Sequence, residues 1–215
     1  MDNLIKKKII TKSYNDLKNF AYKNRSKYKN SKPYPHIIVK NFFDKNFLDE
    51  VVKEFPDLSK IKTSTNYNNK NEVKYFNNNK KIFKKNTKIL FKFLNSKKFI
   101  DYLQIITSIQ ERLSADNSLS GGGLHEIKNG GMLKIHTDFN KHPFKKLDRR
   151  INVLIYLNKN WKINYGGHLE LWNKNMNKCV KKVKPLFNTM VIFSTNDFTN
   201  HGHPNPLNCP KTVSR

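Results

Sequence analysis

The glycines of the second half of the chain constrain its fold more than any other feature. Seven of the eight cluster at positions 121–123, 130–131 and 166–167, and short runs rich in β-branched and aromatic residues lie around them. Short strands separated by turn signals are typical of an antiparallel sandwich or barrel and not of a βαβ fold. The runs that we expect to form strands are "GLHEI", "GMLKIHTDF", "RRINVLIYLN", "GGHLELW", "KKVKPLF", "NTMVIFST" and "KTVSR".

The first half of the chain has a helical character instead. Residues 1–30 predict a basic, loosely amphipathic helix, and a short strand is expected over 36–39. A second helix is expected from Asp44, a suitable N-cap, to Glu54, with Pro56 ending it.

Two further segments complete this half. Residues 57–80 are polar, rich in asparagine and without a period, which predicts a surface loop. From residue 81 to 109 apolar side chains recur at helical spacing, which predicts two helices with a break near Asn95 and Ser96. We therefore expect one domain over residues 1–215, with helical support in 1–107 and a β core in 108–215.

The net charge of +26 raises the question of nucleic acid as a partner. Only five of the 42 basic residues are arginine, the side chain best suited to read phosphates and base edges. Lysine and asparagine are abundant everywhere, loops included, so AT-rich codon usage explains the excess more simply. We therefore expect a small-molecule or peptide substrate and no nucleic acid, and the oligomeric state stays open.

Cysteine usage and hydropathy bear on the compartment. Cys179 and Cys209 are too few for a disulfide framework or a zinc cluster, and they suit a reducing environment. No apolar run reaches the length of a membrane span, and the N-terminal sequence lacks an apolar signal core. We expect a cytoplasmic protein that does not enter a membrane.

A histidine and an acid two residues apart mark the end of one expected strand, in "GGMLKIHTDFN". Side chains alternate along a strand, so His136 and Asp138 project from the same face and aim at one point. With one more ligand they would form a facial triad that leaves positions open on Fe(II) for a chelating cosubstrate and dioxygen. The same spacing occurs at His168 and Glu170, but His136 and Asp138 are favoured because a polar loop follows them directly.

The third ligand and a cation are expected downstream. In "MVIFSTNDFTNHGHPNP" an apolar strand leads into a polar turn that holds His201 and His203, either of which could bind a metal. A dicarboxylate cosubstrate also needs a cation at its far end, preferably a guanidinium. Arg215 is favoured for this role, with Lys211 as the second candidate.

These strings together resemble a known family. "HTDFN", "RRINVLIYLNKNW", "YGGHLELW", "FNTMVIFSTND" and "HGHPNPLNCP", followed by "SR" at the end, look like Fe(II)- and 2-oxoglutarate-dependent oxygenases of the prolyl 4-hydroxylase-like superfamily. The similarity covers residues 108–215, and the motifs are specific only in combination. The resemblance implies an α+β chain whose core is a double-stranded β-helix (jelly-roll, cupin-like) with N-terminal supporting helices.

The resemblance also implies roles for single residues. His136, Asp138 and His201 match the iron ligands, and Arg215 matches the arginine that binds the distal carboxylate of 2-oxoglutarate. Tyr156 matches a tyrosine that bonds to the same carboxylate in some relatives, with a core aromatic as the open alternative. No catalytic residue beyond the metal ligands is expected. His203 is expected to orient or solvate its loop, His168 and Glu170 to be structural or to face the substrate, and His125 to face either the cavity or the surface.

The implied cofactors are Fe(II), 2-oxoglutarate and dioxygen, with ascorbate as a further candidate. The implied reaction is hydroxylation of an unactivated C–H bond in a peptide, an amino acid or a saccharide. Relatives continue past "SR" with a strand that closes the sheet, so we expect this chain to be a fragment or to lack that strand. Two alternatives stay open: a dioxygenase that demethylates nucleic acid, and a jelly-roll binding module without catalysis.

Overall fold

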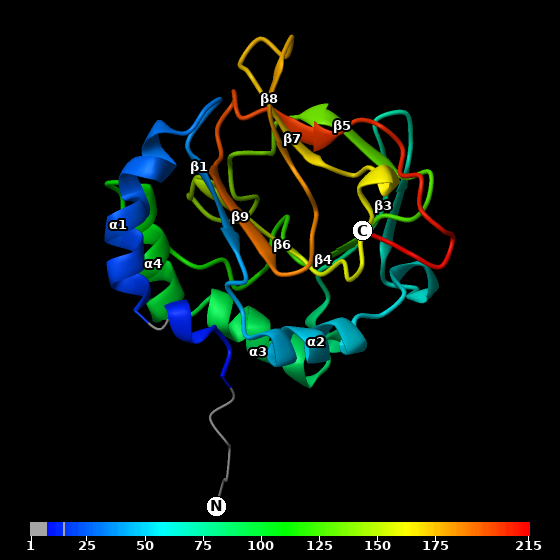
Figure 1. Cartoon of the computed structure of the whole chain (residues 1–215), viewed down its shortest axis with the longest axis horizontal. Coiled ribbons are helices and arrows are strands. Elements are labelled where there is room, and N and C mark those ends of the chain that lie inside the picture. The colour runs from blue at the N-terminus through cyan, green and yellow to red at the C-terminus, as the bar shows by residue number, and fades with distance from the viewer. Residues whose placement is uncertain (1–7, 15) are drawn as a thin grey trace, which may run out of the picture.

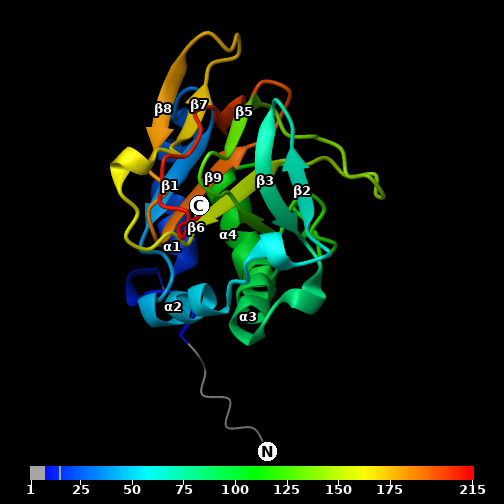
Figure 2. The same ribbon diagram turned by 90° about the vertical axis from the view of Figure 1, so that its right-hand side faces the viewer.

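Two antiparallel sheets, with helices against one of them, make up the computed structural model (Figures 1 and 2), which describes residues 8–14 and 16–215. The α-helices are α1 (Leu17–Asn30), α2 (Lys45–Glu54), α3 (Lys85–Leu94) and α4 (Lys97–Thr107). Short 3-10 helices are η1 (Lys12–Tyr14), η2 (Leu58–Lys60), η3 (Lys80–Ile82) and η4 (Ile163–Tyr165). The strands are β1 (His36–Lys40), β2 (Thr65–Asn68), β3 (Glu72–Asn77), β4 (Leu124–Glu126), β5 (Met132–His136), β6 (Ile151–Tyr156), β7 (Leu169–Trp172), β8 (Cys179–Val183), β9 (Thr189–Ser194) and β10 (His201–His203).

The small sheet has the order β1-β9-β6, and its central strand is buried on both faces. Met190 and Ile192 of β9 belong to the cluster that packs against the helices. Val191 and Phe193, on the opposite face, pack with Leu171 of the large sheet. Because side chains alternate along a strand, an uninterrupted apolar run is what a central strand between two apolar layers requires.

The large sheet has the order β2-β3-β5-β10-β7-β8, and β4 also pairs with β3. Strand β10 lies between β5 and β7, so the chain returns from residue 201 directly beside the end of β5. Figure 2 shows α2 and α3 together below the sheets, whereas α1 and α4 cover the outer face of the small sheet in Figure 1. The mixture of helices and antiparallel sheets confirms the predicted α+β class.

Local capping explains where the helices begin. Asp44 accepts a hydrogen bond from the Phe47 amide at the start of α2, as predicted, and Ser96 does the same for Phe99 at the start of α4. The break between α3 and α4 falls at Asn95 and Ser96, also as predicted.

Three sequence-based expectations were wrong or lie partly outside the described residues. Residues 57–80 are not a loop, because they contain the hairpin β2–β3. The segment "KTVSR" forms no strand, although Arg215 exchanges two backbone hydrogen bonds of 2.8 Å with Ile127. The first helix begins only at Leu17, and residues 1–7 and 15 of the range expected for it lie outside the described part.

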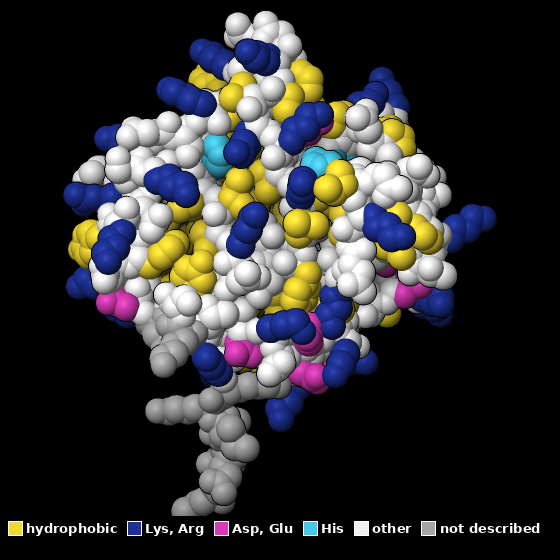
Figure 3. Space-filling view, viewed as in Figure 1, with side chains coloured by type: hydrophobic (Ala, Val, Ile, Leu, Met, Phe, Trp, Pro, Cys, Tyr) yellow, Lys and Arg dark blue, Asp and Glu magenta, His cyan; other side chains and the backbone are white. Residues whose placement is uncertain are grey.

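None of the helices in residues 8–14 and 16–215 is long and apolar enough to cross a bilayer. Figure 3 shows Lys and Arg side chains scattered over the face in view and not gathered into one stripe.

Candidate metal centre

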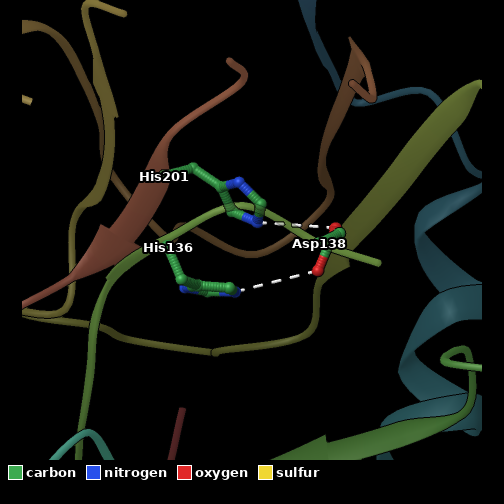
Figure 4. A group of neighbouring side chains, drawn as sticks. All are labelled: His136, Asp138 and His201. Carbon is green, nitrogen blue, oxygen red and sulfur yellow. Dashed lines mark ion pairs between the residues drawn. The ribbon is translucent and has the colours of Figure 1, made fainter. Parts of the chain in front are cut away.

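Strand pairing brings the predicted ligands together. His136 ends β5, His201 begins β10, and the two are directly opposite in the antiparallel register. Asp138 follows β5 by two residues and points at both imidazoles (Figure 4). Within the described part of the chain, these three side chains form the one group of His, Cys, Asp and Glu whose ligand atoms lie within 4.8 Å of one another.

The distances suit an ion and not direct bonding. His136 Nε2 lies 3.7 Å from Asp138 Oδ1, and His201 Nε2 lies 3.6 Å from Asp138 Oδ2. Contacts of this length are too long for hydrogen bonds. Two imidazoles and one carboxylate are also the donor set of the facial triad that binds non-haem Fe(II). The residues present therefore fit an iron site.

Backbone contacts orient both imidazoles. His136 Nδ1 lies 2.8 Å from the Lys134 carbonyl, and His201 Nδ1 lies 2.9 Å from the Thr199 carbonyl. An N–H at Nδ1 that donates to a carbonyl leaves the lone pair at Nε2, on the side that faces Asp138. Burial lowers the pKa of His201 to about 4, against the opposing effect of Asp138, so this ring is neutral and able to bind a metal near neutral pH.

Two further residues engage Asp138. Burial alone would raise the pKa of its carboxyl group, but the contact with His136 and the nearby His201 and Arg149 outweigh it and hold the pKa well below the usual value. Asn152 donates a hydrogen bond of 2.8 Å to Oδ2, and Arg149 Nη2 lies 3.4 Å from the same oxygen.

Sequence reasoning missed both of these partners of Asp138. Asn152 stands out in the strand "INVLIY" as its one amide side chain, but nothing in the sequence indicates Asp138 as its partner.

The candidate cosubstrate residues lie in the same cavity as the triad, whose volume is about 1430 Å³. Arg215 Nη2 donates a hydrogen bond of 3.0 Å to the hydroxyl oxygen of Tyr156, and the guanidinium lies 5.1 Å from the centre of that ring. Burial raises the pKa of Tyr156 and Arg215 partly opposes this, so the hydroxyl stays protonated. Lys211 also borders this cavity, but it is exposed in a turn. The structure therefore places Arg215 and Tyr156 together.

His168 and His125 lie in different surroundings. His168 lies outside the triad, and the Glu170 carboxylate is occupied by the Trp172 indole N–H at 2.9 Å and by Lys182 at 2.7 Å. His125 lines the cavity, and its side chain is exposed to that space. Protein atoms around the ring lower its pKa to about 4, mainly through loss of solvation.

His203 is buried beside the triad. Burial, followed by Arg215, lowers its pKa to about 2. The Asn205 backbone opposes this shift, although neither ring nitrogen has a hydrogen bond of good geometry within the described residues.

Comparisons with known proteins agree with this geometry. Residues 122–215 match the model of the 2OG-Fe(II) oxygenase superfamily. No curated protein matches the chain.

Among solved structures, a prolyl hydroxylase from Trichoplax adhaerens, determined with a peptide fragment of the oxygen degradation domain of hypoxia inducible factor, has 18% identity and a TM-score of 0.59 over 92% of this chain and 88% of its own. A prolyl 4-hydroxylase from Phytophthora capsici has 21% identity and a TM-score of 0.62 over 93% of this chain and 63% of its own. One from Pseudomonas putida has 13% identity and a TM-score of 0.58 over 87% and 92%. These similarities confirm the predicted double-stranded β-helix.

Proposed function

We propose that this chain, whose residues 122–215 match the 2OG-Fe(II) oxygenase superfamily, hydroxylates a C–H bond of a peptide, with His136, Asp138 and His201 as its iron ligands. The enzyme is a hydroxylating dioxygenase of the prolyl 4-hydroxylase-like type that uses Fe(II), 2-oxoglutarate and dioxygen. The observation that carries the assignment of ligands is the convergence of the three side chains on one point.

Iron bound by the triad would supply the dioxygen chemistry, in which 2-oxoglutarate becomes succinate and carbon dioxide while the substrate C–H bond becomes C–OH. The contribution of the protein is to orient the three ligands. The carbonyls of Lys134 and Thr199 fix both imidazoles, and Asn152 and Arg149 engage Oδ2 of Asp138 and so hold the carboxylate in front of them.

The cosubstrate is assigned to the same cavity. Arg215 and Tyr156 present a guanidinium and a hydroxyl group beside each other, which suits the distal carboxylate of 2-oxoglutarate. Leu133, Leu154 and Leu169 also line the cavity, and apolar walls of this kind limit the access of water to the reacting atoms.

A peptide substrate is supported by two observations. The cavity exceeds the roughly 300–1,000 Å³ typical of small-ligand pockets. In addition, the similar Trichoplax enzyme was determined with a bound peptide. Single amino acids and saccharides are the competing substrate classes.

The ligand assignment is tested by an anaerobic titration of 2-oxoglutarate into the Fe(II)-loaded protein, monitored by the visible charge-transfer band of the chelate. We expect a band in the unsubstituted protein and in His168→Ala, and none in Asp138→Ala. Equal bands in the two variants would contradict the assignment of the triad.

The substrate class is tested by the rate at which 2-oxoglutarate is converted to succinate. We expect proline-containing peptides to accelerate this conversion more than free proline or oligosaccharides at the same concentration. A response to oligosaccharides alone would overturn the peptide proposal and leave the oxygenase chemistry intact.

A further inference from the structure

His203 is a buried side chain for which the proposed mechanism has so far given no role. It lies two residues after His201 on β10, where the pairing with β5 is irregular, and both imidazoles are buried and line the same cavity. Only 2% of His203 is exposed, and within residues 8–14 and 16–215 neither ring nitrogen makes a hydrogen bond of good geometry, although the Asn205 backbone lies near enough to act on the ring. A histidine that served packing alone would normally find a partner for its N–H, because an unsatisfied buried donor is costly.

Within the described residues, Arg215 also has a buried nitrogen atom without a hydrogen bond. Its Nε is also buried without a partner in the described part of the chain, while its Nη2 donates to Tyr156. His203, Arg215 and Tyr156 line one cavity. The His203 ring and the Arg215 guanidinium, each with a buried nitrogen that lacks a good hydrogen bond in the described residues, therefore border the same cavity.

The chemistry of these groups specifies a ligand. An imidazole offers at least one N–H, a guanidinium offers several, and a tyrosine hydroxyl can also donate. A carboxylate accepts hydrogen bonds at two oxygens and donates none, so it would satisfy all three groups at once. The leucines that line the cavity suit the methylene carbons of the same ligand.

We propose that His203 donates a hydrogen bond to the distal carboxylate of 2-oxoglutarate, next to Arg215 and Tyr156, and so selects dicarboxylic over monocarboxylic 2-oxo acids. This inference rests on the proposed function, since it assigns a positioning and selectivity role within that same site. It differs from the role expected from the sequence, which was to orient or solvate the loop.

The test uses the Fe(II)-loaded chain under anaerobic conditions and three variants. His203→Val removes both ring nitrogens, and His203→Gln keeps an N–H donor on a side chain of similar reach. His168→Val is the matched control, because this histidine lies outside the cavity. The two probes are 2-oxoglutarate and 2-oxopentanoate, which carries a methyl group in place of the distal carboxylate.

We expect His203→Val to weaken 2-oxoglutarate binding about 10-fold or more, as loss of a hydrogen bond to a charged group predicts. Binding of 2-oxopentanoate should change far less, and His203→Gln should recover much of the loss. Fe(II) affinity, measured without any 2-oxo acid, and the melting temperature should show whether each variant keeps the metal site and the fold.

Equal weakening of both probes in His203→Val and His203→Gln, with Fe(II) binding intact, would overturn the inference. So would unchanged affinity for 2-oxoglutarate in His203→Val. If the unsubstituted protein bound Fe(II) but gave no charge-transfer band with either probe, the proposed function would fail together with this inference. The two failures are therefore distinguishable.

Discussion

At the scale of single residues, the position of Asp138 depends on side chains that bind no metal. Asn152 and Arg149 both engage its Oδ2 atom, and this fixes the carboxylate with Oδ1 toward His136 and Oδ2 toward His201. Partners of this kind fix the orientation of a ligating carboxylate, and their loss typically weakens metal binding about 10- to 100-fold.

We expect Asn152→Ala to lower Fe(II) affinity about 10-fold. The physical reason is that the freed carboxylate can rotate away from the metal position, so binding must first restrict it. Equilibrium titration with Fe(II) under anaerobic conditions measures the effect, and Asn175→Ala, at an exposed position, serves as the control. Equal affinities in the two variants would show that Arg149 alone holds Asp138.

Much of the candidate site could be predicted at this scale. The period of a strand makes His136 and Asp138 neighbours in space whatever the rest of the fold. The residues alone left His201 and His203 open as the third ligand, and the family resemblance selected His201. Asn152 was missed because its role exists only once β6 lies beside the end of β5. That is a tertiary contact between residues 14 positions apart, and no local pattern records it.

At the scale of elements, α3 depends on a cap supplied by another helix. Lys84 at the N-cap position makes no side-chain capping bond. The Glu54 carboxylate, at the end of α2, accepts backbone N–H bonds of 2.7 Å from Asn86 and 2.9 Å from Thr87 instead. Burial alone would raise the pKa of Glu54, but these backbone hydrogen bonds outweigh it and lower the pKa, so the carboxylate is charged at the positive end of the helix dipole.

We expect Glu54→Ala to lower the free energy of unfolding by about 2 kcal/mol, because two N–H groups at the start of α3 lose their acceptor. Glu50→Ala in the same helix removes only an exposed ion pair with Lys53 and should cost less than about 0.5 kcal/mol. Urea denaturation of both variants measures the difference. Similar losses in the two variants would rule out a capping role for Glu54.

Elements were predictable where local chemistry determines them. The starts of α2 and α4 follow from Asp44 and Ser96, whose side chains cap the first turn of each helix. The hairpin β2–β3 was missed because β2 is polar and mostly exposed, and because the few apolar residues of the half-buried β3 stand among asparagines and lysines that indicate a loop. The hairpin forms because β3 pairs with β4 and β5, and these contacts depend on the tertiary structure of the sheet.

At the scale of the whole molecule, the cavity continues beyond the metal centre between two strand edges. Within residues 8–14 and 16–215, β6 pairs only with β9 and β4 pairs only with β3, and residues of both strands line the cavity. Arg215 and Ile127 exchange two backbone hydrogen bonds of 2.8 Å, the pattern of an antiparallel pair. A strand attached after Arg215 would therefore run antiparallel along β4, with the free edge of β6 on its other side.

We predict that a variant extended after Arg215 by six residues of alternating apolar and polar character is more stable than the chain of 215 residues. New ladder hydrogen bonds and covered apolar side chains of β6 should add at least about 2 kcal/mol. For a chain of this size, that gain corresponds to a rise in melting temperature of roughly 5 °C. The matched control is an extension of the same composition with proline at two alternate positions, which cannot complete the ladder. Equal melting temperatures for the two extensions would mean that the space between β4 and β6 does not accept a strand. If only the alternating extension raises the melting temperature, it should also tighten 2-oxoglutarate binding, because Arg215 would then be held on both sides.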